Sequence, residues 1–162
     1  MQPKIVQEDY MAIFKRRQRS IENMINECLR GDVQQNALDY IAFLRANGFK
    51  IERNTKHDGW NMKKKRATPA FLHVGSEKND FGIVFNSGDF KGPADDALKE
   101  FAWAHVLVCP SGCGGSEICK LSRKRLTVLG KDYENVCIAP LDFWNLGGEE
   151  LEMAKKLTLM LE

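Results

Sequence analysis

The chain has 162 residues, of which 43% are hydrophobic and 28% charged. This length and composition predict one folded domain with its own core and exclude a globally disordered chain. The net charge of +2 is too even to indicate a nucleic-acid or anionic-membrane partner. The first residues contain no apolar h-region, and no run of about 18 apolar residues occurs. We therefore expect no signal peptide, no membrane partner and a cytoplasmic protein with reduced thiols.

Residues 9–48 have the pattern of two helices. Apolar side chains recur at three- and four-residue steps from Tyr10 to Leu29, which predicts one amphipathic helix ending near Gly31. A second helix is expected to begin at Asp32. Asn47-Gly48 should end it, because both residues tolerate a positive φ.

The middle of the chain predicts strands. The stretch 49–53, "FKIER", alternates, and 81–88, "FGIVFNSG", is a short apolar run between polar turns. Between them, Pro69 interrupts 59–75, which predicts either two short strands or one edge strand with a bulge. The connections are too short for parallel crossovers, so we expect an antiparallel meander.

The rest of the chain predicts a central helix from Pro93 that ends at Pro110, two strands and a closing helix. The strands are "RLTVLG" and "NVCIAPLDFW", and the closing helix starts after Gly147-Gly148. The prediction is a single α+β domain over 1–162 in the order ααβββαββα, with a helical segment at 9–48 and the sheet with a cysteine-rich segment at 49–162. About five antiparallel strands should carry the helices on one face.

Four of the five cysteines fall within the stretch 105–137, which begins at His105. Their spacing is C-x3-C-x5-C-x17-C. Glycines in "CPSGCGGSEIC" allow the backbone to fold back so that sulfur atoms converge, and zinc prefers four such ligands. We therefore predict a zinc site made of Cys109, Cys113, Cys119 and Cys137, with His105 as a substitute for Cys119.

Two other interpretations of the cysteines stay open. The thiols can be small buried side chains packed near one another, as Cys28 on the first helix is expected to be. Alternatively, Cys109 and Cys113 form a redox pair. The paired C-x2-C knuckles of zinc ribbons and the spacings of iron–sulfur proteins are missing. Alternation predicts that Cys137 points to the sheet face opposite to Val136 and Ile138.

The basic run 63–66, "KKKR", follows Trp60 and is a candidate for nucleic-acid binding. Alternation splits these charges between two faces, so a solvated edge strand protected by lysines is the preferred interpretation. The basic cluster 15–19 is likewise expected to be a solvated helix face.

Acid–base chemistry has candidates only in His57, Asp58 and His73. Motifs for a serine nucleophile, a phosphate loop or a dinucleotide cofactor do not occur. We expect no cofactor besides zinc, and a function that leans away from catalysis.

Aromatic residues are candidates for a ligand site on the open sheet face or in the groove between sheet and helices. The site is expected at Trp60, Trp103 and Tyr133, with Phe85 and Trp144 as further lining residues. The competing interpretation is that most of these rings belong to the core.

A tryptophan–lysine stretch, "GWNMKKKRATPAFLHVG", precedes the cysteine-rich segment, and "TVLGKDYENVC" follows it. In these features the chain resembles a group of small uncharacterised bacterial proteins with a G-K-x-[YF]-x-N-V-C stretch, over most of residues 35–160. The resemblance implies the fold and the grouping of the four cysteines, and it implies no activity.

The prediction for function is a non-enzymatic binding or sensing domain with a structural or regulatory zinc site. One alternative is a thiol-dependent enzyme or redox sensor that uses the region of Cys109 and Cys113. A second is nucleic-acid binding through the basic strand 63–66. The oligomeric state, the ligand and any protein partner are not predicted.

Overall fold

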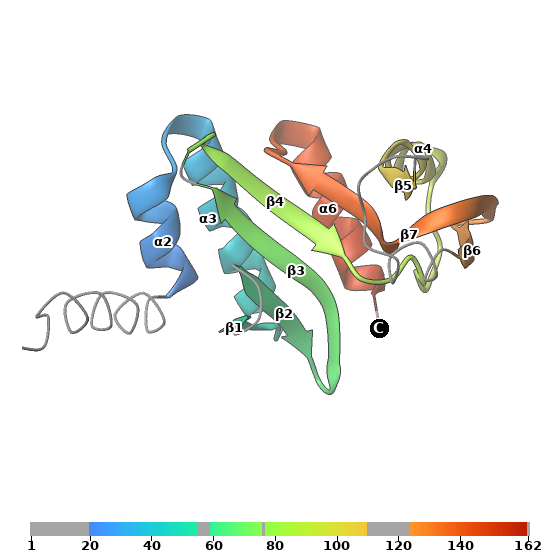
Figure 1. Ribbon diagram of the computed structural model, residues 1–162, viewed down its shortest axis with the longest axis horizontal. Coiled ribbons are helices and arrows are strands. Elements are labelled where there is room, and N and C mark those ends of the chain that lie inside the picture. The colour runs from blue at the N-terminus through green and yellow to red at the C-terminus, as the bar shows by residue number, and fades with distance from the viewer. Residues whose placement is uncertain (1–19, 55–58, 76, 110–123, 162) are drawn as a thin grey trace, which may run out of the picture.

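The computed structural model describes residues 20–54, 59–75, 77–109 and 124–161. Within these ranges the chain forms four helices and a seven-stranded antiparallel sheet (Figure 1), which confirms the α+β prediction and exceeds the expected strand number. The helices are α2 (Ile21–Cys28), α3 (Gly31–Ala46), α4 (Asp96–Ala104) and α6 (Gly148–Met160). The strands are β1 (Lys50–Arg53), β2 (Trp60–Lys64), β3 (Ala67–Gly75), β4 (Asp80–Phe85), β5 (Val106–Val108), β6 (Lys124–Val128) and β7 (Lys131–Trp144).

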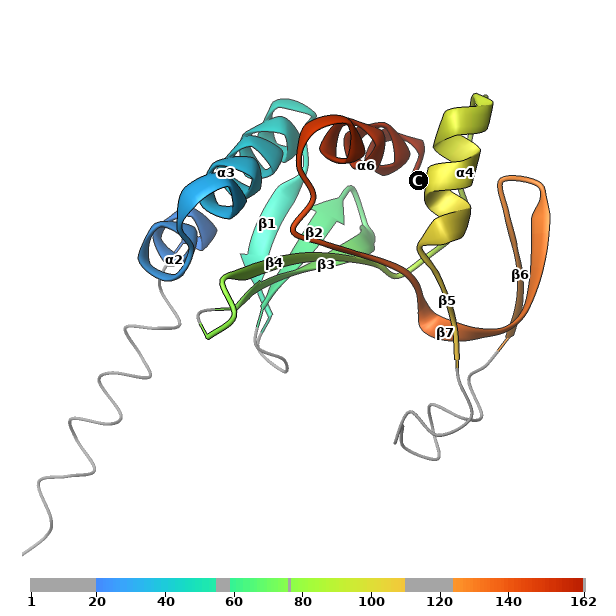
Figure 2. The same cartoon turned by 90° about the horizontal axis from the view of Figure 1, so that it is seen from above.

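The sheet has the strand order β1-β2-β3-β4-β7-β5, and β6 pairs with β7 outside this path. Strands β1 to β4 form the predicted antiparallel meander. The four described helices lie over one face of the sheet, as expected (Figure 2). The opposite face carries none of them.

The segment 59–75 forms a hairpin of two strands, β2 and β3, which confirms the first of the two expected arrangements and excludes a single edge strand. The chain turns between β2 and β3 at Lys65, whose φ is 54°. Strand β2 pairs with β1 on one side and β3 on the other, so β1 is the edge. Pro69 lies within β3, where the β2–β3 register shifts between Met62 and Lys64. That irregularity tolerates the missing N–H of the proline.

The predicted helix up to Pro110 is too long. Helix α4 ends at Ala104, His105 is its C-cap, and the next residues form β5. Two of the three β5 residues are β-branched valines, Val106 and Val108, which favour extended backbone. Pairing with β7 then makes this segment a strand and not a helix, since Val106 pairs with Leu141.

The predicted signals hold for α3 but not for the first helix, because Ser20 is extended and the expected single helix from Tyr10 to Leu29 cannot run through it. The Ser20 side chain caps α2 by accepting a hydrogen bond from the Asn23 N–H. Residues 9–19 of the expected first helix lie outside the described residues. Helix α3 starts at Gly31, one residue before the predicted Asp32, and Gly48 follows it with φ of 78°.

The core lies between the helix layer and the covered face of the sheet. Ile25 of α2, Leu44 of α3 and Leu157 of α6 are fully buried, as are Leu72 and Phe143 of the sheet. Each such side chain contributes about 1.5–3 kcal/mol by leaving water. Cys28 is partly buried against this core, as expected. In the described part of the chain, no helix is long and apolar enough to cross a bilayer.

A buried hydrogen-bond chain links α3 to α6. The Thr158 hydroxyl donates to the Ala154 carbonyl at 2.7 Å, so Tyr40 must be the donor in its 2.7 Å contact with Thr158 Oγ1. Burial raises the pKa of Tyr40 well above its usual value.

Salt bridges of Lys155 form a second link between the same helices. Lys155 Nζ lies 2.6 Å from Asp39 Oδ2 and 2.7 Å from Glu152 Oε1. Burial by itself would lower the pKa of Lys155, but these carboxylate partners hold it above its ordinary value. Helices α3 and α6 are therefore joined by polar as well as apolar contacts.

Replacing Thr158 by Val should destabilise the protein by about 1–3 kcal/mol, because the Tyr40 hydroxyl would stay buried without its acceptor. Denaturant unfolding measures the loss. Tyr40→Phe should cost less, since Thr158 keeps its bond to Ala154. The double variant should lose less than the sum of the two single losses. Additive losses would mean that this hydrogen bond does not stabilise the fold.

Candidate functional site

Cys109 and Cys137 lie on neighbouring strands. Val108 pairs with Val136, and the Cys109 N–H donates to the Asn135 carbonyl at 2.9 Å. Cys137 follows two residues after Asn135 along β7, so both cysteines belong to the same stretch of the β5–β7 pairing. Cys109 is buried and Cys137 is partly exposed. The register thus brings together two of the four predicted zinc ligands.

The opposite edge of β7 carries β6 at the same level. Lys124, the first residue of β6, also pairs with Val136. Val108 and Lys124 therefore flank Val136 on its two sides, which separates their Cα atoms by about 10 Å, twice the strand spacing. The chain between them includes Cys113 and Cys119, which lie outside the described residues. The described residues before and after that segment, Cys109 and Lys124, contact β7 at Asn135 and Val136.

The prediction for the direction of Cys137 rested on simple alternation, which this part of β7 does not follow. Val136 is buried, but Ile138 is 53% exposed. The β5–β7 register shifts between Val106 and Val108, and Asn135 has a positive φ of 56°. An irregular strand has no strict two-residue period, so the neighbours of Cys137 do not share one environment.

His105 has the environment of a helix-end residue. Its Nδ1 lies 2.8 Å from the Phe101 carbonyl oxygen, and its ring centre is 4.6 Å from that of Phe101 and 4.8 Å from that of Phe143. Within the described ranges, no three His, Cys, Asp or Glu side chains converge to hold a metal ion.

Trp103 and Tyr133 come together, as the aromatic-site prediction requires. The Trp103 Nε1–H donates to the Val128 carbonyl at 2.7 Å, and the Tyr133 hydroxyl donates to the Trp103 carbonyl at 3.4 Å. Lys131 Nζ lies 5.0 Å from the centre of the Trp103 ring and 5.4 Å from that of Tyr133. Sequence reasoning missed Lys131, although its position two residues before Tyr133 on one strand places both on the same face. These contacts attach α4 to the β6–β7 hairpin.

Trp60 does not join this pair. It is buried under the helices, and the guanidinium of Arg53 lies 4.3 Å from the centre of its ring. Phe85 is also a core residue, stacked edge-on against Phe143 at 5.1 Å. Two of the five aromatic candidates therefore belong to the core, as the competing interpretation holds.

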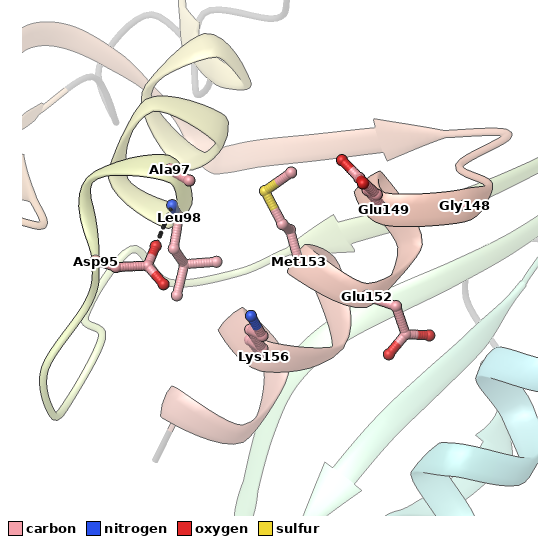
Figure 3. Close-up of a pocket in the computed structure, with 8 residues that line it drawn as sticks. All are labelled: Asp95, Ala97, Leu98, Gly148, Glu149, Glu152, Met153 and Lys156. Carbon is pink, nitrogen blue, oxygen red and sulfur yellow. Dashed lines mark hydrogen bonds between the residues drawn. The ribbon is translucent and has the colours of Figure 1, made fainter.

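A cleft of about 550 Å³ opens between α4 and α6 (Figure 3). Its lining is mostly apolar, with Leu98 and Met153 facing each other across it. Two of its carboxylates are engaged, since Asp95 caps α4 through the Leu98 N–H and Glu152 binds Lys155. The full lining is Asp95, Ala97, Leu98, Gly148, Glu149, Glu152, Met153 and Lys156. No sequence pattern pointed to this cleft, because it depends on how two separate helices pack.

The basic run 63–66 does not form one continuous patch. Lys63 Nζ binds Glu52 Oε2 at 2.5 Å, and Lys64 Nζ lies 4.7 Å from the centre of the Phe49 ring. Lys65 and Arg66 follow β2 in the hairpin turn. Strand and turn positions thus separate these charges.

The acid–base candidates are also separated. His57 and Asp58 lie outside the described residues. His73 lies on the open face of the sheet beside Trp144, at 5.6 Å between ring centres.

Comparison with protein-family models, curated proteins and solved structures found no match to this chain.

Replacing Trp103 by Phe should destabilise the protein by about 1–3 kcal/mol, because the hydrogen bond from the indole to the Val128 carbonyl and part of the packing of the ring would be lost. Thermal or urea unfolding measures the change. Lys131→Met is the matched control, and it should cost under about 1 kcal/mol because it removes only an exposed cation–π contact. If Trp103→Phe unfolds like the wild type, this ring does not fasten the hairpin and is open to a ligand role.

Proposed function

We propose that the protein is a non-enzymatic binding or sensing domain in which Cys109, Cys113, Cys119 and Cys137 bind one zinc ion. One observation supports this above the others. Two strands pair with β7 on opposite sides of Val136, and the adjoining residues include Cys109 and Cys137.

The chemistry of the proposed ligands suits zinc. Four thiolates satisfy its tetrahedral preference, and cysteines from a strand, a neighbouring strand and a glycine-rich connection are an ordinary source of such ligands. Cys113 is four residues from Cys109, and Cys119 is five residues from Lys124. Both are therefore tethered to anchor points on either side of β7.

The main effect of the proposed zinc site would be to stabilise the fold. Strand β5 has three residues, and β6 pairs with β7 but with no other strand in the described sheet. A metal that joins the end of β5 to β7 would stabilise this end of the sheet, because zinc binding contributes directly to folding free energy.

The thiol-dependent alternative has some support from the same geometry. A thiol at the end of β5 is also a candidate for redox chemistry, and the pair to examine is Cys109 with Cys113. The two proposals differ in what the purified protein should contain.

Elemental analysis of protein purified under reducing conditions, after zinc-supplemented expression, should find about one zinc ion per chain. Chelation should lower the melting temperature. At free zinc of about 1,000 times Kd the stabilisation is about 4 kcal/mol.

Cys109→Ser and Cys137→Ser should each lose most of the zinc. Cys28→Ala is the matched control and should retain it, because Cys28 lies on α2 against the core. Absence of zinc from the wild-type protein would reject the proposal. Fast alkylation of Cys109 or Cys137 near neutral pH in metal-free protein would then favour the redox alternative.

A further inference from the structure

The indole of Trp144 lies flat on the face of the sheet that the described helices leave uncovered. Trp144 pairs with Gly82 of β4. A Cβ atom at Gly82 would lie 2.6, 2.8 and 2.9 Å from three adjacent carbons of the six-membered ring, Cζ3, Cη2 and Cε3. Such nearly equal distances result from an approach to the face of a ring and not to its edge. One face of the indole therefore covers Gly82, and the 44% exposure of Trp144 belongs mainly to the other face.

Neighbouring groups hold this ring in place. The Trp144 Nε1–H donates to Asp142 Oδ2 at 2.9 Å. The His73 ring meets the indole edge-on, with 5.6 Å between centres and 63° between planes. A ring fixed on three sides loses little conformational entropy when a ligand stacks on it, so the platform is preorganised.

The other two tryptophans show what such a ring binds within this protein. Arg53 lies over Trp60, and Lys131 lies over Trp103. In the described part of the chain, Trp144 has no cation over its ring. The indole face attracts cations more strongly than the faces of the other aromatic side chains.

The charges around the platform are negative. Asp142 lies two residues before Trp144 on β7, and Asp80 lies two residues before Gly82 on β4, so both share the open face. Neither carboxylate forms a salt bridge with any other described residue. Phe71 and Val84, which are partly exposed, form the neighbouring row of the same face.

We propose that this face binds an arginine side chain presented by a partner polypeptide. The planar guanidinium would stack on the outer face of Trp144 and pair with the Asp80 carboxylate, because arginine combines stacking with fork-like hydrogen bonding to carboxylates. Its aliphatic stem would lie along Val84. The open surface suits a side chain carried by another chain, and the Gly82 backbone leaves room for the indole to lie flat.

The test is a titration of ¹⁵N-labelled protein with the peptide Gly-Gly-Arg-Gly-Gly, followed through the indole N–H signals of the three tryptophans. Trp144→Phe assigns its own signal by removing it. The Trp144 signal should shift in a saturable way, and the Trp103 signal should stay in place. The same peptide with citrulline in place of arginine keeps the shape and lacks the charge, so it should bind at least about 2- to 5-fold more weakly.

Asp80→Asn should weaken arginine-peptide binding by roughly 2- to 5-fold, as expected for one exposed ion pair. Asp96→Asn is the matched control and should change nothing, since Asp96 lies on α4 and its side chain is almost fully exposed. Equal shifts with the citrulline peptide or with tetramethylammonium would overturn the guanidinium assignment. Tighter binding of methylguanidinium than of the peptide would overturn the polypeptide source. A Trp144 signal that never moves would reject the site.

Discussion

The pairing of β7 is the constraint on which the rest of this structure depends. Its 14 residues join the four-stranded meander to the remaining two strands. The end of β7 from Leu141 to Trp144 pairs with β4, the part from Val136 to Leu141 pairs with β5, and the part from Lys131 to Val136 pairs with β6. A three-residue strand such as β5 has too few hydrogen bonds to persist without such a neighbour. The geometry at Cys109 and Cys137 is thus a consequence of how β7 is paired.

The helix layer gives this long strand its support. Phe143 is buried beneath the helices, where Phe101 of α4 stacks on it with 5.4 Å between ring centres. Helix α4 also holds the β6–β7 hairpin through the hydrogen bond from Trp103 to Val128. Helices α3 and α6 are joined over the meander by the Tyr40–Thr158 bond. These hydrogen bonds therefore fix the orientations of the helices. Apolar packing by itself would allow a wider range of orientations.

Tryptophan has three different roles in one small domain. Trp60 is part of the core with Arg53 over its ring, and Trp103 fastens a hairpin with Lys131 over its ring. Trp144 is held equally firmly, but its free face points to solvent. The proposed zinc site and the proposed cation platform use different parts of β7, near Val136 and near Trp144 respectively. Failure of one proposal would therefore leave the other standing.

The sequence by itself determined the local elements that have strong signals of their own. The stop signal Asn47-Gly48 after α3 and the apolar run of β4 depend on residues within a few positions of one another. The α+β class and the antiparallel meander follow from these elements and their short connections. The interpretation of 63–66 as part of an edge strand was wrong because the turn at Lys65 contains neither Gly nor Pro. The positive φ of Lys65 is imposed by the pairing of β2 with β3.

Only the tertiary structure decided β5, the neighbours of the cysteines and the side on which each tryptophan lies. Val106 to Val108 continue an apolar helical pattern, and they become a strand because β7 supplies hydrogen bonds that a free segment lacks. Trp60 and Trp144 both lie on a strand and both precede an asparagine, yet one is buried and the other is not. Period-two alternation tells which residues share a face, but only the packing of the helices tells which face is covered.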